Sequence, residues 1–169
     1  MPPEELLPLV ATTSPRILHY FLDHHGLSLT ADGPGPGLAL AVALSSGTEA
    51  HHRLVTVRAL LELGVGLARL PNPAANPAVH YMREGEEDLL ALLLAHGADP
   101  NAVTRSGSTM LHRYMWSMRP KSEDWLRTLH RFGVDFGLRD CHQRTALECG
   151  RLPGRIAAVL RELTPQPDQ

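Results

Sequence analysis

The sequence predicts an all-α fold, a solenoid of stacked helix-turn-helix units with short β-turn or hairpin connections. The first observation is a repeat: the segment around Gly97 returns 36 residues later at Gly133, and the segment around Thr109 returns at the same distance at Thr145. Two independent markers share one period, and a period in this range indicates stacked units. The second observation is a Leu-rich amphipathic run ahead of each glycine, which can bury one stripe against a neighbouring unit.

Glycine and threonine mark the ends and starts of the predicted helices. A helix that is followed by a reversing chain needs a residue in the left-handed region, which glycine occupies without steric cost. A threonine directly before apolar residues can accept a hydrogen bond from an amide of the first helical turn. The predicted helix ends are Gly26, Gly64, Gly97 and Gly133, and the predicted helix starts are Thr109 and Thr145.

Two segments resemble the ankyrin repeat. Residues 108–112, Ser-Thr-Met-Leu-His, correspond to its Thr-Pro-Leu-His helix start, and residues 97–101, Gly-Ala-Asp-Pro-Asn, to its Gly-Ala-Asp-x-Asn exit into a β-turn. The resemblance covers residues 75–163 and extends to residues 1–64 through the rhythm of helix pairs. It departs from the family pattern at Gln143, where a glycine is usual.

The resemblance implies one domain built from about four units and an N-terminal helical cap. The predicted parts of domain 1–169 are the cap at 1–30, a degenerate repeat at 31–67, repeats at 68–103 and 104–139, a C-terminal repeat at 140–163 and a flexible tail at 164–169.

The first half of the chain carries specific expectations. Helices are expected at 4–11 and 15–25, whereas the Gly- and Pro-rich residues 31–37 are expected to hold no regular element. The inner and outer helices of the first unit are expected at 38–44 and 54–63, with residues 45–52 inserted between them.

The family also implies a concave face that binds another protein and performs no catalysis. Tyr, Trp and Arg are the residue types that dominate interface hot spots. Carried over residue by residue, the inner-helix positions of the face are Tyr81, Glu84, Arg113, Trp116 and Ser117, and Arg105, Ser106, Cys141 and His142 are expected at the turn tips. The alternative is that Tyr81 and Trp116 fill gaps under the loops and that Arg113 is merely solvated.

Composition excludes several classes of function. The 16 basic and 18 acidic residues are interspersed and give a net charge of −2, so no electrostatic footprint for nucleic acid or an anionic membrane is present. No apolar run reaches the roughly 18 residues of a membrane span, and the N-terminal residues lack the pattern of a signal peptide. We therefore expect a cytoplasmic protein, monomeric when free, whose Cys141 and Cys149 are reduced thiols.

The histidines are candidate metal ligands and candidate catalytic bases. His24-His25 and His51-His52 are the obvious metal candidates, but adjacent histidines on a helix point in different directions, so no metal and no cofactor is predicted. His80 and His112 match the structural histidines of the family. Phosphate loops, serine elbows and zinc-protease pairs are missing, and Cys141 and His142 have no third group to orient a base, so no catalytic residue is predicted.

Two classes of function remain. The first is a general adaptor that tethers one protein to another. The second is a dedicated inhibitor of one enzyme, such as a bacterial immunity protein or antitoxin that acts on a toxin. A metal-binding or hydrolytic protein that uses the His-rich segments is a remote alternative.

Overall fold

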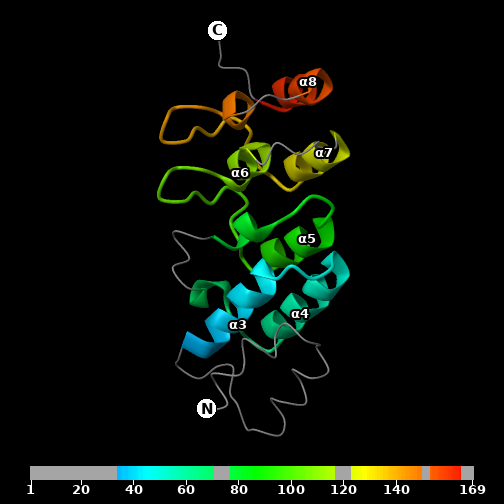
Figure 1. Cartoon of the computed structure of the whole chain (residues 1–169), viewed down its shortest axis with the longest axis vertical. Helices are drawn as coiled ribbons and strands as arrows, with labels where there is room; N and C mark the ends of the chain where they lie inside the picture. Colours follow the sequence, from blue (N-terminus) through cyan, green and yellow to red (C-terminus); the bar gives the residue numbers. More distant parts are fainter. Residues whose placement is uncertain (1–33, 71–76, 117–122, 150–152, 165–169) are drawn as a thin grey trace, which may run out of the picture.

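Stacked pairs of helices form the described part of the molecule (Figure 1). The computed structural model describes residues 34–70, 77–116, 123–149 and 153–164. The predicted cap at 1–30, with its expected helices at 4–11 and 15–25, lies outside these residues. In the described ranges the elements are α3 (Pro34–Ser45), α4 (Ala50–Glu62), η1 (Leu67–Arg69), η2 (Ala78–Tyr81), α5 (Glu87–Ala95), α6 (Met110–Trp116), α7 (Glu123–Arg131), η3 (Ala146–Cys149) and α8 (Gly154–Leu163), where η denotes a 3₁₀-helix.

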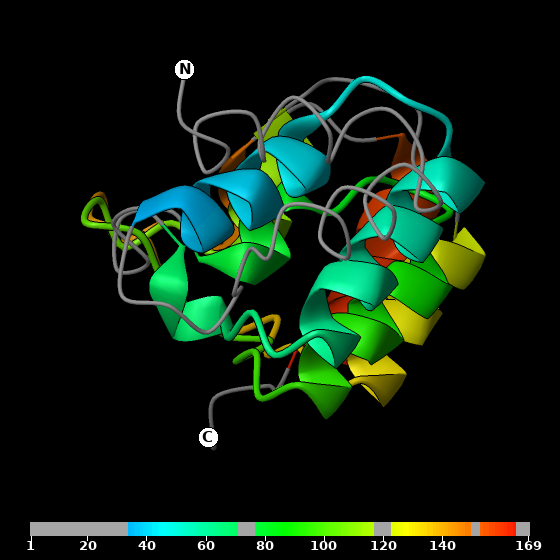
Figure 2. The same ribbon diagram turned by 90° about the horizontal axis from the view of Figure 1, so that it is seen from below.

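The helices form two layers, which separate clearly in the view along the stack (Figure 2). The inner layer contains α3, η2, α6 and η3, and each of these contacts the next. The outer layer contains α4, α5, α7 and α8, with contacts between α4 and α5 and between α7 and α8. The described part holds an isolated bridge between Arg139 and Thr145 but no strand. The predicted all-α fold is therefore confirmed.

Two apolar clusters form the core and meet at α5. Leu89 and Leu93 of α5 belong to the cluster around α3 and α4, whereas Leu90 belongs to the cluster around α6, α7 and α8. Trp125 of α7 belongs to the second cluster and is 2% exposed. The second unit thus links the two halves of the core, because η2 likewise contributes Ala78 to the first cluster and Val79 to the second. Nearest-neighbour packing of this kind is typical of a repeat protein.

The predicted helix ends are confirmed wherever they can be seen. Gly64, Gly97 and Gly133 have φ of 90°, 86° and 80°, and Gly26 lies outside the described residues. Thr109 also begins a helix as expected, because its hydroxyl accepts from the amide of His112 at 3.4 Å. Thr145 acts differently. Its amide and its hydroxyl both donate to the carboxylate of Glu148, at 2.7 and 3.2 Å.

The start of the first unit was predicted incorrectly in two places. Residues 31–37 were expected to hold no regular element, yet α3 begins at Pro34. Proline is compatible with the first helical turn, where its missing N–H would have no partner in any case. The segment 45–52 was expected to be an insertion, but α4 begins at Ala50, so only residues 46–49 separate the two helices.

Two of the inner elements are shorter than the inner helix that a repeat of equal units would contain. In the second and fourth units the inner element is a single 3₁₀ turn, η2 or η3. Glu84, expected on the inner helix of the second unit, lies instead in the turn that follows η2, next to Gly85 with its φ of 81°. The full inner helix α6 belongs to the third unit, whose sequence carries the motif most completely.

A buried ion pair joins the first unit to the second. Arg53 of α4 is 1% exposed, and its guanidinium lies 2.7 Å from Oε1 of Glu86, just before α5. The same guanidinium donates to the carbonyls of Leu44 and Tyr81 at 2.6 and 3.0 Å. Oε2 of Glu86 accepts from the amide of Arg83 at 2.9 Å. Nothing in the sequence pattern distinguished Arg53 from a solvated arginine.

Candidate protein-binding face

Two successive turns project from the inner layer and stack on one another (Figure 1). In the first, the amide of Thr104 donates to the carbonyl of Ser108 at 3.0 Å. In the second, 36 residues later, the amide of Asp140 donates to the carbonyl of Arg144 at 2.9 Å. The amide of Cys141 donates to the carbonyl of Ser106 at 3.0 Å and ties the two turns together. The period read from the sequence therefore places equivalent turns in register.

Gly107 permits this close stacking. Its φ is 70°, and a Cβ added to it would lie 3.1 Å from the amide nitrogen of Cys141 and 3.3 Å from the carbonyl carbon of Asp140. The equivalent residue of the next turn is Gln143, which adopts φ of 59° without being glycine. The departure from the family pattern at Gln143 therefore changes the side chain and keeps the left-handed backbone.

Asp140 organises the second turn. Its Oδ1 accepts from the amides of His142 and Arg144 at 2.8 and 3.0 Å. Its Oδ2 accepts from Nη2 and Nε of the Arg144 guanidinium at 2.8 and 3.2 Å. The hydrogen bonds from Arg144 hold the pKa of the Asp140 carboxyl well below its usual range. The carboxylate is thus committed to the turn and offers no free oxygen to a partner.

Two histidines connect each inner element to the following turn. Nε2 of His80 lies 3.0 Å from the carbonyl of Ala102, and Nε2 of His112 lies 2.9 Å from the carbonyl of Arg144. Because a carbonyl only accepts, Nε2 carries the proton in both rings. Burial, with smaller contributions from the charges of Arg113 and His112, lowers the pKa of His80. Both histidines have the structural role that was expected of them.

A groove of about 530 Å³ runs between the two turns and the inner layer. We call it the turn-tip groove. Its lining residues are Thr104, Ser106, Ser108, His112, Arg113, Asp140, Cys141, His142, Arg144 and Cys149. Burial raises the pKa of the Cys149 thiol, so this side chain is a neutral thiol at pH 7. The groove combines hydroxyl, imidazole and guanidinium groups and can bind a polar or charged surface.

The predicted binding residues divide between this groove and other places. Arg113 and His142 are both exposed and both line the groove. Arg105 is exposed on the adjoining turn tip. Trp116 is the last residue of α6, and Ser117 lies outside the described residues.

The remaining two predicted residues lie in the second unit. Tyr81 is half-buried and packs against the core cluster of α3 and α4, which agrees with its alternative role as a gap filler. Glu84 lies close enough to Tyr114 of α6 to act on it. Burial first, and the Glu84 carboxylate second, raise the pKa of the Tyr114 hydroxyl. Neither residue lines the turn-tip groove.

Several groove residues were not predicted, although a signal for them exists. Projecting the 36-residue period from residues 104–108 gives residues 140–144, and this set contains Asp140 and Arg144. The repeat period therefore places the rest of the second turn beside the first.

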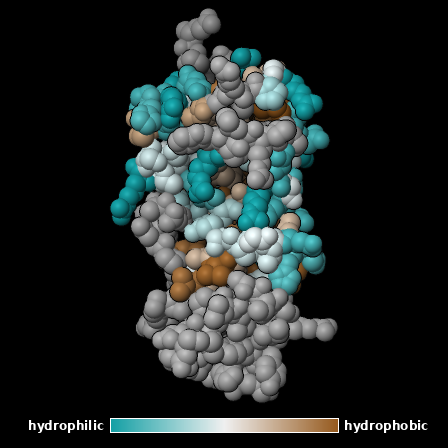
Figure 3. Space-filling view, in the orientation of Figure 1, coloured by the Kyte–Doolittle hydropathy of each residue, from teal (hydrophilic) through white to brown (hydrophobic). Residues whose placement is uncertain are grey.

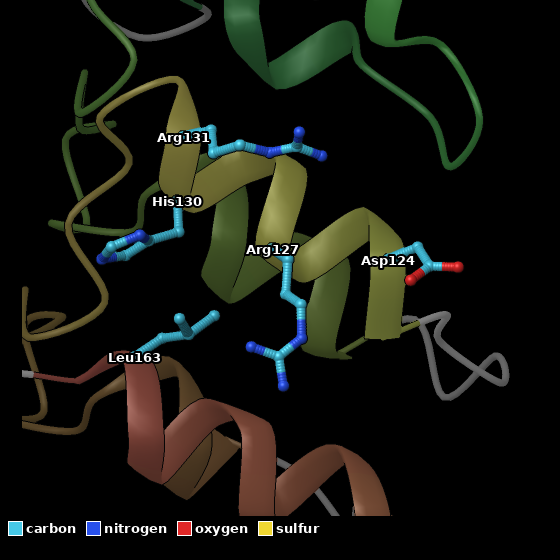
Figure 4. Close-up of a pocket in the computed structure, with 5 residues that line it drawn as sticks. All are labelled: Asp124, Arg127, His130, Arg131 and Leu163. Carbon is cyan, nitrogen blue, oxygen red and sulfur yellow. The ribbon is translucent and has the colours of Figure 1, made fainter.

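A second hollow, of about 360 Å³, lies on the opposite, outer layer between α7 and α8 (Figure 4). Its labelled side chains point in different directions: Arg127 points toward α8, whereas Arg131 and Asp124 point away from it (Figure 4). Arg127 is already paired with Glu162 at 2.9 Å. Because its polar groups do not converge, this hollow is a weaker binding candidate than the turn-tip groove.

The surface is not uniform in polarity. Hydrophilic side chains cover much of the later units, whereas hydrophobic ones gather over the first described unit (Figure 3). Leu38 of α3 is 44% exposed. The described residues contain no group of three or more His, Cys, Asp or Glu placed to hold a metal ion. Among the helices of these same residues, none is long and apolar enough to cross a membrane.

The stacked units, the projecting turns and an open groove define a helical-repeat protein that offers a face to a partner. No protein-family model matches the chain. The chain is 35% identical over 107 residues to the B-cell lymphoma 3 protein homolog of Mus musculus, and the match covers 62% of this chain and 23% of that protein. It is 34% identical over 111 residues to human cyclin-dependent kinase inhibitor 2A, covering 66% of this chain and 65% of the relative.

The match to cyclin-dependent kinase 4 inhibitor B of Bos taurus covers more of the relative. There the identity is 32% over 114 residues, or 66% of this chain and 85% of the bovine protein. The chain belongs to the ankyrin-repeat family. The relatives are non-enzymatic proteins of this family, and they support a non-catalytic protein-interaction role. The chain spans 23% and 65% of the length of the first two relatives.

Proposed function

We propose that this protein binds a partner protein through the turn-tip groove and the adjoining inner face. The observation that supports this most directly is the division of labour in the two turns. Their backbone amides bond to one another and to Asp140, whereas Arg113, Ser106 and His142 remain exposed along the groove. A surface whose backbone is internally satisfied and whose polar side chains are exposed suits recognition of another protein.

In its finer form the proposal is an inhibitor of one enzyme. Two relatives are named as inhibitors of cyclin-dependent kinases, and the match covers 85% of the bovine one. The relatives are animal proteins, so they support the inhibitor in this general form rather than as a bacterial immunity protein. A general adaptor is the second candidate, because the mouse relative, of which the chain covers 23%, is not named as an inhibitor.

The test is affinity capture from cells of the source organism, with the immobilised full chain and two variants. Ser106→Trp places a bulky ring in the groove and blocks any partner there, whatever its charge. Arg58→Trp places the same ring on the exposed outer face of α4 and is the matched control. We expect a partner that wild type and Arg58→Trp retain and that Ser106→Trp loses, with equal melting temperatures for all three proteins.

The same partner then separates the two candidates. An inhibitor reduces the activity of a captured enzyme at a one-to-one ratio, whereas an adaptor leaves that activity unchanged. Equal capture by Ser106→Trp and wild type would exclude the groove. We also propose that the free protein is a cytoplasmic monomer, which light scattering after size exclusion and the localisation of a tagged chain would test.

A further inference from the structure

We propose that the turn-tip groove selects an acidic segment of its partner protein, with an Asp or Glu carboxylate bound by Arg113. This inference rests on the proposed function, because it names the kind of partner that the same groove takes. It follows from the charges that line the groove, from their hydrogen-bond partners and from the state of the surrounding backbone amides.

The groove exposes positive charge and conceals its negative charge. Among the lining residues the acidic one is Asp140, whose side chain is 4% exposed and whose two oxygens accept four hydrogen bonds from His142 and Arg144. Arg113 is exposed, and its side chain makes no ion pair or hydrogen bond with any described residue. The only charge of the groove without compensation in the described chain is therefore a guanidinium.

Of the neighbouring arginines, one is compensated and one adds to this charge. The Arg144 side chain is 43% exposed, but its charge is balanced by Asp140. Arg105 is exposed on the adjoining turn tip and, like Arg113, forms no ion pair with the described residues. The whole chain carries a net charge of −2, so this local excess of arginine departs from the average surface. Complementary charge of this kind steers a partner and fixes its register.

Hydroxyl groups stand beside the arginines. Thr104 and Ser106 lie 2.9 Å apart through their side-chain oxygens, and Ser106 and Ser108 lie 3.3 Å apart. Each hydroxyl can rotate to donate to an incoming oxygen. A carboxylate that binds the planar Arg113 fork with two oxygens can also accept from a hydroxyl of this row, whereas a cationic or apolar segment would leave the Arg113 guanidinium without a partner.

The backbone favours a carboxylate over a phosphate group. Phosphate sites commonly use free amides at a helix start or in a concave turn. Here the amides of Thr104, Gly107, Cys141, His142 and Arg144 are already bonded within the two turns. The donors left for a ligand are therefore side-chain groups, and the one unpaired guanidinium, that of Arg113, matches one carboxylate.

The test is fluorescence anisotropy with the full chain and labelled eight-residue peptides in which glycine alternates with Glu, Gln, Lys or phosphoserine. We expect the Glu peptide to bind at least about tenfold more tightly than the Gln and Lys peptides at low salt. Raising NaCl from about 50 to 300 mM should weaken that binding at least about threefold, because the contact is exposed to salt screening.

Variants locate the contact. We expect Arg113→Glu to weaken binding of the Glu peptide by about tenfold or more and Arg113→Gln by about threefold, because reversal adds repulsion to the loss of the ion pair. Arg58→Glu makes the same charge change on the outer face and should change the affinity less than about twofold. Amide chemical-shift changes on titration should concentrate at residues 104–108 and 140–144.

Equal binding of the Glu and Gln peptides, or equal effects of Arg113→Glu and Arg58→Glu, would overturn the inference. Preference for the phosphoserine peptide would replace the carboxylate with a phosphate group. If Ser106→Trp abolishes partner capture but Arg113→Glu does not, the proposed function holds and the acidic selection is wrong. If the Glu peptide binds as expected but no captured partner depends on the groove, the selection holds and the proposed function fails.

Discussion

The buried pair of Arg53 and Glu86 predicts a large and localised loss of stability when the arginine is removed. Replacing one member of a buried pair costs about 3–5 kcal/mol, because the other charge stays buried without its partner. Arg53→Met removes the 2.7 Å contact with Glu86 and also the donors to two carbonyls. Glu86 keeps the amide of Arg83 at 2.9 Å, which offsets part of the loss. We expect the free energy of unfolding to fall by about 4 kcal/mol.

The loss should be concentrated in the first unit. Arg53 belongs to α4, whereas Trp125 is buried in the second core cluster. In a repeat protein the weakened unit can unfold before its neighbours. During urea titration of Arg53→Met, the circular dichroism signal at 222 nm should therefore decrease before the tryptophan fluorescence changes. In wild type the midpoints of the two unfolding transitions should lie closer together.

Two further variants complete the experiment. Arg58→Met, on the exposed face of the same helix, is the control and should change the free energy of unfolding by less than about 0.5 kcal/mol. Glu86→Gln preserves the shape of the side chain and should cost about 2 kcal/mol. If the pair acts as a unit, the double variant should lose about 1–3 kcal/mol less free energy of unfolding than the sum of the two single losses. A loss below about 1 kcal/mol for Arg53→Met, or strict additivity, would refute the reasoning.

Three other expectations concern the core, a turn and pH. Leu93→Ala, at a fully buried position of α5, should lower the free energy of unfolding by about 2–5 kcal/mol in urea titration, and a loss under about 1 kcal/mol would contradict its core position. Gly107→Ala should cost about 1–3 kcal/mol because its Cβ would lie 3.1 Å from a backbone nitrogen, whereas Gly47→Ala, with nothing within 4 Å, should cost far less; equal losses would contradict this. Burial lowers the pKa of His80 below 6.5, so its contribution is complete above pH 6.5 and is lost as the pH falls from there toward the folded pKa. Denaturation between pH 7 and 5 should show this decline, and a His80→Gln variant that declines equally would argue against it.

The period and the helix ends could be predicted because each depends on local chemistry. Gly97 and Gly133 mark points where the chain must turn through the left-handed region, and Thr109 marks a helix start. Such requirements are written in single residues and recur with the unit. The stacked turns at Thr104 and Asp140 follow from the same period. The groove becomes evident only when the two turns are placed against one another in space.

The parts that could not be predicted depend on packing. Pro34 lies in a Gly- and Pro-rich segment that predicts no helix, yet as a residue of the first helical turn it begins α3. Residues 78–81 form one 3₁₀ turn where the repeat would place a full helix, and this moved Glu84 off the inner layer. Arg53 has an ordinary sequence environment, and its burial depends on Glu86, 33 positions away, closing over it. Local patterns carry no information about such a partner.

The last turn has a consequence for how binding selectivity can change over time. Gly107 has no room for a side chain because the next turn lies against it, whereas the exposed Gln143 holds φ of 59° with a full side chain. Its carbonyl and the amide of the turn maintain the backbone, since Gln143 donates to Asp140 and accepts from Arg139. The tip is therefore a place where an exchange of side chain alters the outer contour of the protein and leaves its scaffold intact, so that related chains can diverge in partner choice one residue at a time.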